Sequence, residues 1–501
     1  MAIKTSTTSL ILVALLQLLL RYSVADEWPI IQSTRFGDIQ GKRKNVLNKE
    51  VDTFLGIPYA QPPVGELRYK PPKPWITRWD GPLDATEFGN NCWQPKLSLD
   101  HPGLMWQFAT ESLNEDCLFL NIWSPYPRRS DAAIMVWFHG GSFNWGSSGV
   151  KEYNGQVLAV TQNVIVITVN YRLGPLGFLS LGNSEVPGNV GLMDQAMALR
   201  WVKENIANFG GDPELVTIFG SSAGGASVGY HLFSPISRVL FRRAILESGT
   251  PNSPALRPID DETNTVNTKK LIESLGCMYD ERDLAHPDTI ECLRNKPAED
   301  VTSNVFAGKN HNIVIDGEFL DRDFDTMMAE HDFKSTEIMV GNCEREWMIN
   351  LYLNNFYSLE SQNPLTHALY RKYAHPCIKG ANLSSAVTES VYFHYTDWTD
   401  PYNPIKLRDA VDAICGDYKL SCPSVQFVHT YAMAGNPAYY YSLHKRANAS
   451  PWPEWMGAVH GQEITYVFGH PLDVTNEGFL KEDVYLSKQM MKHWANFAKY
   501  G

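Results

Sequence analysis

The chain has 501 residues, of which 44% are hydrophobic and 20% are charged, with 36 Gly and 30 Pro. This is the composition of a large globular protein, and it excludes a disordered or low-complexity chain. Acidic residues outnumber Lys and Arg by 55 to 43, which gives a formal charge of -12, and the chain contains no basic cluster. We therefore expect no nucleic-acid partner.

The first 25 residues have the parts of a secretory signal peptide. Lys4 precedes an apolar run from Leu10 to Leu20, and small residues follow at Ser23-Val24-Ala25, where signal peptidase needs them. A membrane anchor fits less well, because Gln17 interrupts the run and the run is shorter than the roughly 20 residues that span a bilayer. We expect residues 1–25 to be removed and the protein to be secreted and extracellular, with no membrane anchor visible.

The chain contains eight cysteines and two glycosylation sequons. An even number of cysteines in a secreted chain favours disulfides over metal binding. No Cys-x-x-Cys pair with matching His occurs, so we expect no metal site and no cofactor. The sequons begin at Asn382 and Asn448, and Pro451 directly after the second one weakens it.

Between residues 130 and 250, short β-branched runs alternate with helical patterns. The runs span residues 134–138, 164–169 and 216–219. An amphipathic stretch from Met193 to Phe209 precedes the last run, and such alternation indicates a mainly parallel sheet with helices on its faces. The chain shows no internal repeat and no linker between two halves. We expect one domain over residues 26–501, with the charged segment 255–330 as an insertion on it.

The pentapeptide Gly220-Ser-Ser-Ala-Gly224 follows the run Val216–Phe219 directly and precedes a helical pattern. A G-x-S-x-G pentapeptide alone carries little information, but between a strand and a helix it is the nucleophile elbow of α/β hydrolases. The turn lifts the Ser222 hydroxyl clear of the sheet, and the N-terminus of the following helix favours a developing anion. The sequence predicts Ser222 as a nucleophile; the alternative is an ordinary Gly-rich turn.

A second glycine-rich turn, His139-Gly-Gly-Ser-Phe143, follows the strand predicted at 134–138. Acyl transfer needs hydrogen-bond donors for the tetrahedral oxyanion, and glycines after a strand leave backbone N–H groups unobstructed. We expect the N–H groups of Gly141, Ser142 and Ala223 to form an oxyanion hole. A serine nucleophile also needs a base and an orienting acid, in the chain order Ser, acid, His. With 14 His and 55 acidic residues, composition does not choose them.

Further motifs resemble the type-B carboxylesterase and cholinesterase family, in the family's order from about Trp28 to Gly501. They are FLGIPYA at 54–60, EDCLFLNIW at 115–123, NVGL at 189–192, NFGGDP at 208–213 and FRRAIL at 241–246. Pro453-Glu-Trp-Met-Gly457, followed by His460-Gly461, is similar to the acetylcholinesterases of that family in particular. The resemblance implies an α/β-hydrolase fold, with a mainly parallel central sheet flanked by helices, and serine carboxylic-ester hydrolase activity.

Matched onto the family's motifs, His460 is the general base and Glu346 is the acid. Glu344 is the alternative acid, because Trp347 stands where the family usually has Gly. Ser248 matches a buried serine that supports the acid. The resemblance therefore completes the catalytic set Ser222, Glu346 and His460.

The resemblance also implies three long-range pairs. They are the disulfides Cys92–Cys117 and Cys277–Cys292 and the ion pair Arg68–Glu115. Cys422 matches a cysteine whose family partner lies beyond residue 501, so we expect the domain to be incomplete at its C-terminus. Cys343, Cys377 and Cys415 also lack family partners and stay unassigned.

Trp106 matches the indole that stacks on the choline headgroup, and Tyr153 matches one aromatic residue of the gorge wall. A quaternary ammonium group cannot donate a hydrogen bond, so an aromatic face is its natural receptor. Other family positions differ here. Ser221 replaces a Glu, Ala255 replaces an acyl-pocket Trp, Asn144 and Ile349 replace gorge aromatics, and the acyl-pocket stretch 304–312 has Phe306 as its one aromatic residue.

The leading hypothesis is a secreted serine hydrolase that cleaves choline esters, acetylcholine above all, through an acyl-enzyme on Ser222. Ser221 and the thinned gorge favour an alternative, a general carboxylesterase acting on neutral esters. A third hypothesis is a neuroligin-like adhesion protein, which is disfavoured because such proteins typically lack the nucleophile. Acetyl versus butyryl preference and the oligomeric state stay open.

Overall fold

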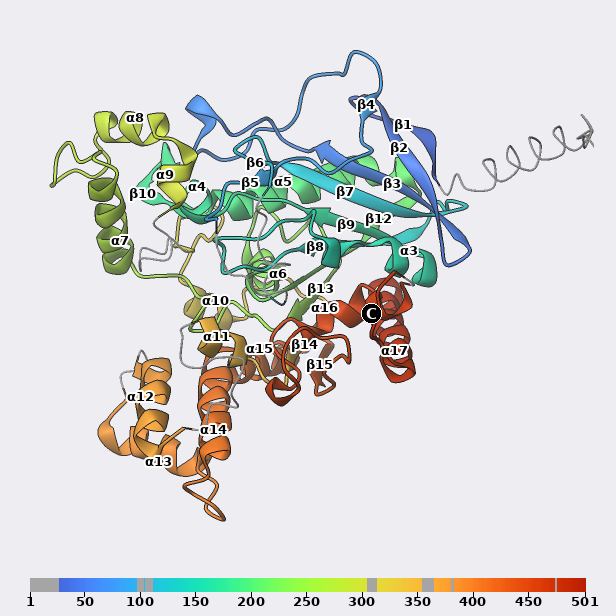
Figure 1. Ribbon diagram of the computed structural model, residues 1–501. Coiled ribbons are helices and arrows are strands. Elements are labelled where there is room, and N and C mark those ends of the chain that lie inside the picture. Colours follow the sequence, from blue (N-terminus) through green and yellow to red (C-terminus); the bar gives the residue numbers. More distant parts are fainter. Residues whose placement is uncertain are drawn as a thin grey trace, which may run out of the picture.

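The computed structural model describes residues 27–96, 103, 111–303, 313–353, 365–379, 383–473 and 475–501. Within them, eleven strands form one mixed sheet (Figure 1). Its strands are β1 (Glu27–Thr34), β2 (Gly37–Val46), β3 (Lys49–Pro58), β4 (Leu83–Asp84), β7 (Phe119–Tyr126), β8 (Ala132–Phe138), β9 (Ile165–Val169), β12 (Gly211–Ser221), β13 (Arg243–Glu247), β14 (Ile338–Cys343) and β15 (Ala438–Leu443).

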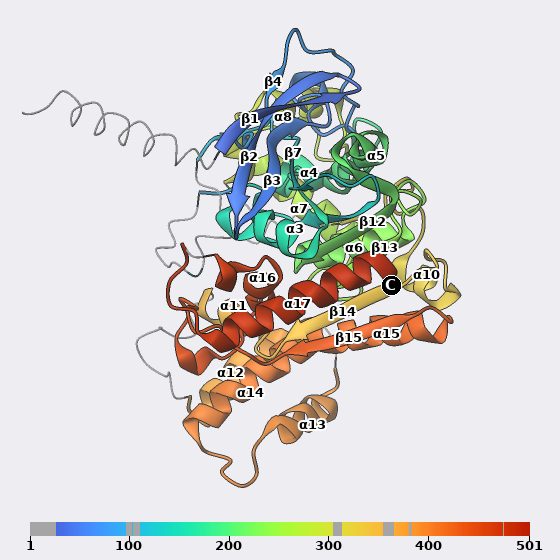
Figure 2. The same ribbon diagram turned by 90° about the vertical axis from the view of Figure 1, so that its right-hand side faces the viewer.

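The strand order is β1-β2-β3-β7-β9-β8-β12-β13-β14-β15, with β4 beside β2. Strands β9, β8, β12, β13, β14 and β15 pair in parallel, as the alternating pattern predicts. The N-terminal strands β1, β2 and β3 pair antiparallel because short turns join them directly, and β7 pairs antiparallel with both β3 and β9. Figure 2 shows this antiparallel part at one end of the sheet and β14 and β15 at the other.

Helices cover both faces of the sheet. On β8, Ile134 and Val136 pack into the core cluster that includes residues of α5 (Val190–Asn205) and α6 (Ala223–Phe233). Met135 and Trp137 pack on the opposite face, with residues of α3 (Gln156–Gln162), α16 (Gln462–Val467) and α17 (Lys481–Tyr500). Since neither face meets water, these strands read as continuous apolar runs rather than as an alternation of apolar and polar residues.

Two helical lobes lie away from the sheet (Figure 1). The first lies in the segment that the sequence analysis described as an insertion, and it contains α7 (Asp261–Ser274), α8 (Pro287–Asn295) and α9 (Ala298–Thr302). The second contains α11 (Met348–Leu353), α12 (His367–Ile378), α13 (Ser385–Tyr395) and α14 (Pro404–Gly416). The other α-helices in the described part of the chain are α4 (Gly174–Phe178), α10 (Phe324–Glu330) and α15 (Cys422–Met433). A separate hydrophobic cluster holds the second lobe together and includes Ile349 of α11.

The structure joins Cys92 to Cys117 and Cys277 to Cys292, the two pairs that the resemblance implies, and Arg68 contacts Glu115. It also joins Cys377 to Cys415, a disulfide that links α12 to α14. The sequence left these two cysteines unassigned, because their pairing depends on how the two helices pack.

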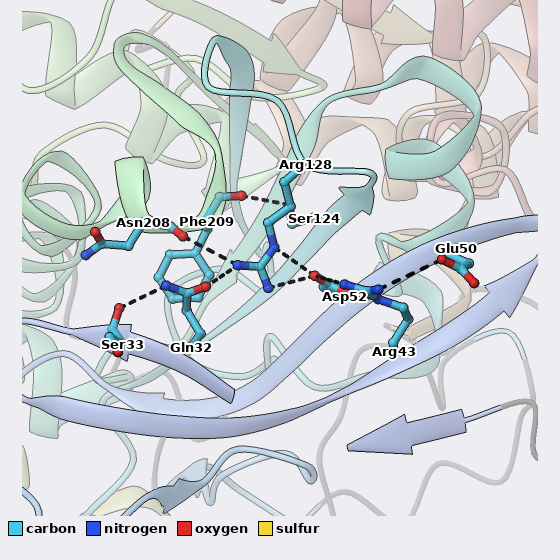
Figure 3. Close-up of polar contacts among 9 residues, drawn as sticks. All are labelled: Gln32, Ser33, Arg43, Glu50, Asp52, Ser124, Arg128, Asn208 and Phe209. Carbon is cyan, nitrogen blue, oxygen red and sulfur yellow. Dashed lines mark hydrogen bonds and ion pairs between the residues drawn. The ribbon is translucent and has the colours of Figure 1, made fainter. Parts of the chain in front are cut away.

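A buried ion-pair network anchors the N-terminal strands (Figure 3). Asp52 on β3 is fully buried and accepts hydrogen bonds from Arg43 Nε at 2.5 Å and from Arg128 Nε at 2.7 Å. Arg128 also contacts the side chain of Gln32 on β1. A buried carboxylate is tolerated only when it is paired and hydrogen-bonded, and two guanidinium groups meet this condition here. The network ties β1, β2 and β3 to the turn that follows β7.

Candidate active site

Ser222 lies in the sharp turn between β12 and α6. Its backbone has φ 60° and ψ -124°, a conformation that costs about 1–3 kcal/mol and persists only where surrounding contacts enforce it. Its N–H donates to the carbonyl of Glu247 at 2.8 Å. Close packing completes the turn, because a Cβ atom at Gly224 would lie 2.0 Å from the carbonyl oxygen of Phe138. The flanking glycine is therefore required for α6 to approach β8.

Ser222 lines a cavity of about 60 Å³. Its lining residues are Gly140, Gly141, Ser142, Trp145, Tyr153, Ser221, Ser222, Ile349, Asn350, Leu353, His460, Gly461 and Ile464. The structure thus brings the predicted nucleophile, the predicted base and two of the predicted oxyanion residues to one place. A larger cavity of about 450 Å³ adjoins it and shares His460, Gly461 and Ile464.

His460 is held by a buried carboxylate. Its Nδ1 lies 2.5 Å from Glu346 Oε2, and Glu346 is only 2% exposed. Glu346 Oε1 accepts hydrogen bonds from the Cys343 N–H at 2.7 Å and from Asn342 Nδ2 at 3.0 Å. Glu344, the alternative acid, is exposed. With Nδ1 bound to Glu346, Nε2 is the nitrogen that can exchange a proton with a hydroxyl group.

The negative charge of Glu346 and the positive charge of protonated His460 stabilise each other. Burial raises the pKa of Glu346, but the neighbouring His460 charge and the hydrogen bonds from His460 and Asn342 outweigh it, so the pKa is lowered overall. Burial lowers the pKa of His460, but the charge and hydrogen bond of Glu346 and the charge of Glu463 outweigh it, so this pKa is raised. An ionised Glu346 beside a histidine that readily accepts a proton is the arrangement that activates a hydroxyl nucleophile.

The glycine-rich turn after β8 lies directly against Ser222. A Cβ atom at Gly140 would lie 3.1 Å from Ser222 Cβ. Gly141 has φ 110°, and a Cβ atom there would lie 2.0 Å from the carbonyl oxygen of Trp145, so the position needs glycine. Ser142 adopts a positive φ of 53°. Ala223 is the first residue of α6, where backbone N–H groups have no partner within the helix.

Of the other predicted residues, some lie at the cavity and others lie away from it or outside the described residues. Tyr153 is buried, lines the cavity, and packs 5.1 Å from the Trp137 ring centroid. Asn144, which stands where the family has a gorge aromatic, is buried, and its side chain donates to the Ser142 carbonyl at 2.6 Å and so braces the turn. Asn448 is exposed. Trp106, Phe306, Asn382 and residues 1–25 lie outside the described residues.

One group beneath the cavity has no counterpart in the sequence analysis. The Ser221 hydroxyl donates to Glu463 Oε1 at 2.6 Å, so a buried carboxylate contacts the residue that replaces a Glu here. Glu463 is not part of any motif described above. Its proximity to His460 in the sequence is the one signal that could have indicated it.

The fold and the site together define the class of protein, an α/β hydrolase with a serine at its nucleophile elbow. A model of the carboxylesterase family matches residues 29–501, and the chain belongs to that family. It is 39% identical to a cholinesterase of Mus musculus over 490 residues, which cover 95% of this chain and 79% of the relative. It is 38% identical to an acetylcholinesterase of Bungarus fasciatus over 483 residues, 94% of this chain and 78% of the relative.

The protein is therefore a serine carboxylic-ester hydrolase. The predictions of family, fold class and enzyme class are confirmed.

Proposed function

We propose that the protein hydrolyses choline esters, acetylcholine above all, through an acyl-enzyme on Ser222. The Ser222 oxygen attacks the ester carbonyl while His460 takes the hydroxyl proton. His460 then gives this proton to the departing choline oxygen, and Glu346 holds the imidazole and stabilises its charge. Water, deprotonated by His460, attacks the acyl-enzyme, releases acetate and restores Ser222.

The negative charge on the carbonyl oxygen in both tetrahedral intermediates would be met by the N–H groups of Gly141, Ser142 and Ala223. One observation carries the proposal: His460, bound to the buried Glu346, lines the same cavity as the strained Ser222. An adhesion protein with this fold would not need a nucleophile, a base and an acid arranged in this way.

Two observations favour a choline ester over other esters. Relatives named cholinesterase and acetylcholinesterase are 39% and 38% identical to this chain. Gly103, three residues before Trp106, packs against Trp452, since a Cβ atom at Gly103 would lie 2.6 Å from that ring. Trp452 lines the larger cavity together with His460 and Gly461. Gly103 therefore lies against the wall of the cavity that His460 lines, while Trp106 itself lies outside the described residues.

The choline assignment is tested with Trp106→Ala. Loss of an indole face from a desolvated ammonium group removes about 2 kcal/mol, so we expect kcat/KM for acetylthiocholine to fall roughly thirtyfold. The uncharged dimethylbutyl analogue should lose much less, because it has no cation to place on the ring. The measurement is kcat/KM for both substrates in both proteins.

Trp398→Ala is the matched control, because Trp398 is 59% exposed and lies outside both cavities; it should leave both values unchanged. Equal losses for the two substrates in Trp106→Ala would show that Trp106 is a packing residue. The general carboxylesterase, which Ser221 and the apolar Ile349 and Leu353 in the cavity wall favour, would then be the better function.

The pH dependence follows from His460. Only the neutral imidazole can accept the Ser222 proton, so activity is lost as the pH falls through the pKa of His460. Because the pKa of His460 is raised above 6.5, we expect the loss to begin near neutral pH. The measurement is kcat/KM between about pH 5 and 9. A flat profile would exclude a histidine base.

We propose further that residues 1–25 are removed as a signal peptide, that residues 26–501 form the single catalytic domain, and that Asn382 and Asn448 are glycosylated. The three disulfides and the exposed Asn448 support an extracellular location. Within the described parts of the chain, none of the helices combines the length and the apolar character needed to cross a membrane.

A further inference from the structure

Helix α14 of the second lobe contacts the residues on either side of Glu346. It passes close to the acid, since a Cβ atom at Gly416 would lie 3.3 Å from Glu346 Cβ. One turn earlier on this helix, the carboxylate of Asp412 is only 2% exposed. Its Oδ1 accepts the Trp347 N–H at 3.0 Å, and its Oδ2 lies 3.7 Å from Arg345 Nη1. Asp412 therefore contacts both chain neighbours of the proposed acid.

The segment that carries Glu346 is also joined to the segment that carries His460. The Arg345 N–H donates to the Ala458 carbonyl at 2.9 Å, and Arg345 forms an isolated parallel β-bridge with Val459. These bridged residues directly precede the acid and the base in the chain. The contact of 2.5 Å between Glu346 Oε2 and His460 Nδ1 therefore depends on where the backbone around Arg345 lies.

Stability alone does not account for a carboxylate at position 412. Burial raises the pKa of Asp412 to about 7, although the charge of Arg345 and the hydrogen bond from the Trp347 N–H lower it. The charges of Asp409 and Glu346 raise this pKa further, so the charged groups that face Asp412 are these two and Arg345. Because the pKa is above its ordinary value of 3.8, ionisation of Asp412 lowers the free energy of unfolding as the pH rises from 3.8 to about 7. A neutral side chain of the same shape would be no less stable here.

We propose that Asp412 is a positioning residue for the catalytic acid, because its carboxylate holds the backbone on both sides of Glu346 and so keeps Glu346 Oε2 against His460 Nδ1. Asp412 is not among the residues that line the two cavities at the site, so it acts through Glu346 and not on the substrate. The disulfide Cys377–Cys415 joins α14 to α12 and gives Asp412 a rigid support. The proposal rests on the proposed roles of Glu346 and His460 as acid and base.

The first test is Asp412→Asn. The amide oxygen can still accept the Trp347 N–H, but the attraction to Arg345 is lost. At about pH 8.5, where Asp412 is ionised, we expect kcat to fall roughly tenfold and KM to change less than about twofold. The midpoint of thermal unfolding should not fall, because the substitution removes a buried charge. A residue that only supports the fold would give the opposite result, a lower midpoint and an unchanged kcat, and this would overturn the proposal.

Asp409→Asn is the matched control. Asp409 lies on the same helix and its Oδ2 lies 3.6 Å from Arg345 Nη2, but the Trp347 N–H goes to Asp412. Its substitution should lower kcat less than about twofold. A loss equal to that of Asp412→Asn would show that the charge around Arg345, and not the hold of Asp412 on both neighbours of the acid, matters for catalysis.

The second test is a double-mutant cycle with Glu346→Gln. If Asp412 acts through the Glu346 carboxylate, then Asp412→Asn should lower kcat less than about twofold once that carboxylate is gone. The same roughly tenfold loss in both backgrounds would mean that Asp412 acts by another route, and would overturn the proposal.

The third test needs no substrate. The proton between His460 Nδ1 and Glu346 should give a far-downfield proton NMR signal in the folded protein, and Glu346→Gln should lose it. Asp412→Asn should move this signal upfield or broaden it, because the hydrogen bond becomes longer, and Asp409→Asn should leave it in place. An unmoved signal in Asp412→Asn would contradict the proposal. The signal reports the contact between the two side chains, so it tests the role of Asp412 even if Ser222 is not the nucleophile.

Discussion

Replacing Ser222 with Ala should lower kcat for acetylthiocholine by roughly 10⁴ or more. Without the hydroxyl no acyl-enzyme can form, and the remaining rate comes from substrate binding and the oxyanion donors alone. His460→Ala should cost about as much, because no other described side chain bonded to Glu346 can take the Ser222 proton. The double variant should be little worse than either single variant, since nucleophile and base act as one unit.

The measurement is kcat of the purified variants, with circular dichroism to show that each is folded. Ser390→Ala is a suitable control, because Ser390 lies exposed on α13 and donates only to a backbone carbonyl of its own helix. A loss below tenfold in Ser222→Ala, or strictly additive losses in the double variant, would contradict the assignment.

Glu346→Gln should lower kcat by roughly 10³–10⁴ while leaving the local structure intact. The reason lies in the donors around the carboxylate. The Cys343 N–H and Asn342 Nδ2 both point at Oε1, so a glutamine must keep its carbonyl oxygen there. Its NH₂ group then faces His460 Nδ1 and donates to it. This places the imidazole proton on Nε2, so that Nε2 can no longer accept the proton of Ser222.

Glu344→Gln is the matched control. Glu344 is exposed and makes no side-chain hydrogen bond to His460, so its substitution should change kcat less than twofold, a surface-charge effect. The comparison uses kcat at a pH above the acid limb, so that the protonation of His460 does not mask the difference. Similar and mild losses in the two variants would show that another group orients His460.

The sequence by itself determined the features that are local. Strands β8, β9 and β12 are visible as apolar runs because both faces of the sheet are buried, and the elbow at Ser222 is visible because its strand, glycines and helix are contiguous. The turn at Gly140–Ser142 is visible for the same reason. The steric limits on a tight turn act between residues that are close together in the chain, so the residue types at those positions indicate the turn directly.

Tertiary structure alone decided the features that join distant segments. Glu346 and Glu344 are two residues apart and chemically alike, and only packing buries one of them against His460, which lies 114 residues away. Ser221 and Glu463 meet across 242 residues, and Cys377 pairs with Cys415 only because α12 and α14 lie side by side. The reason is physical: burial and the set of hydrogen-bond donors fix the charge of a carboxyl group, and both depend on which elements pack together.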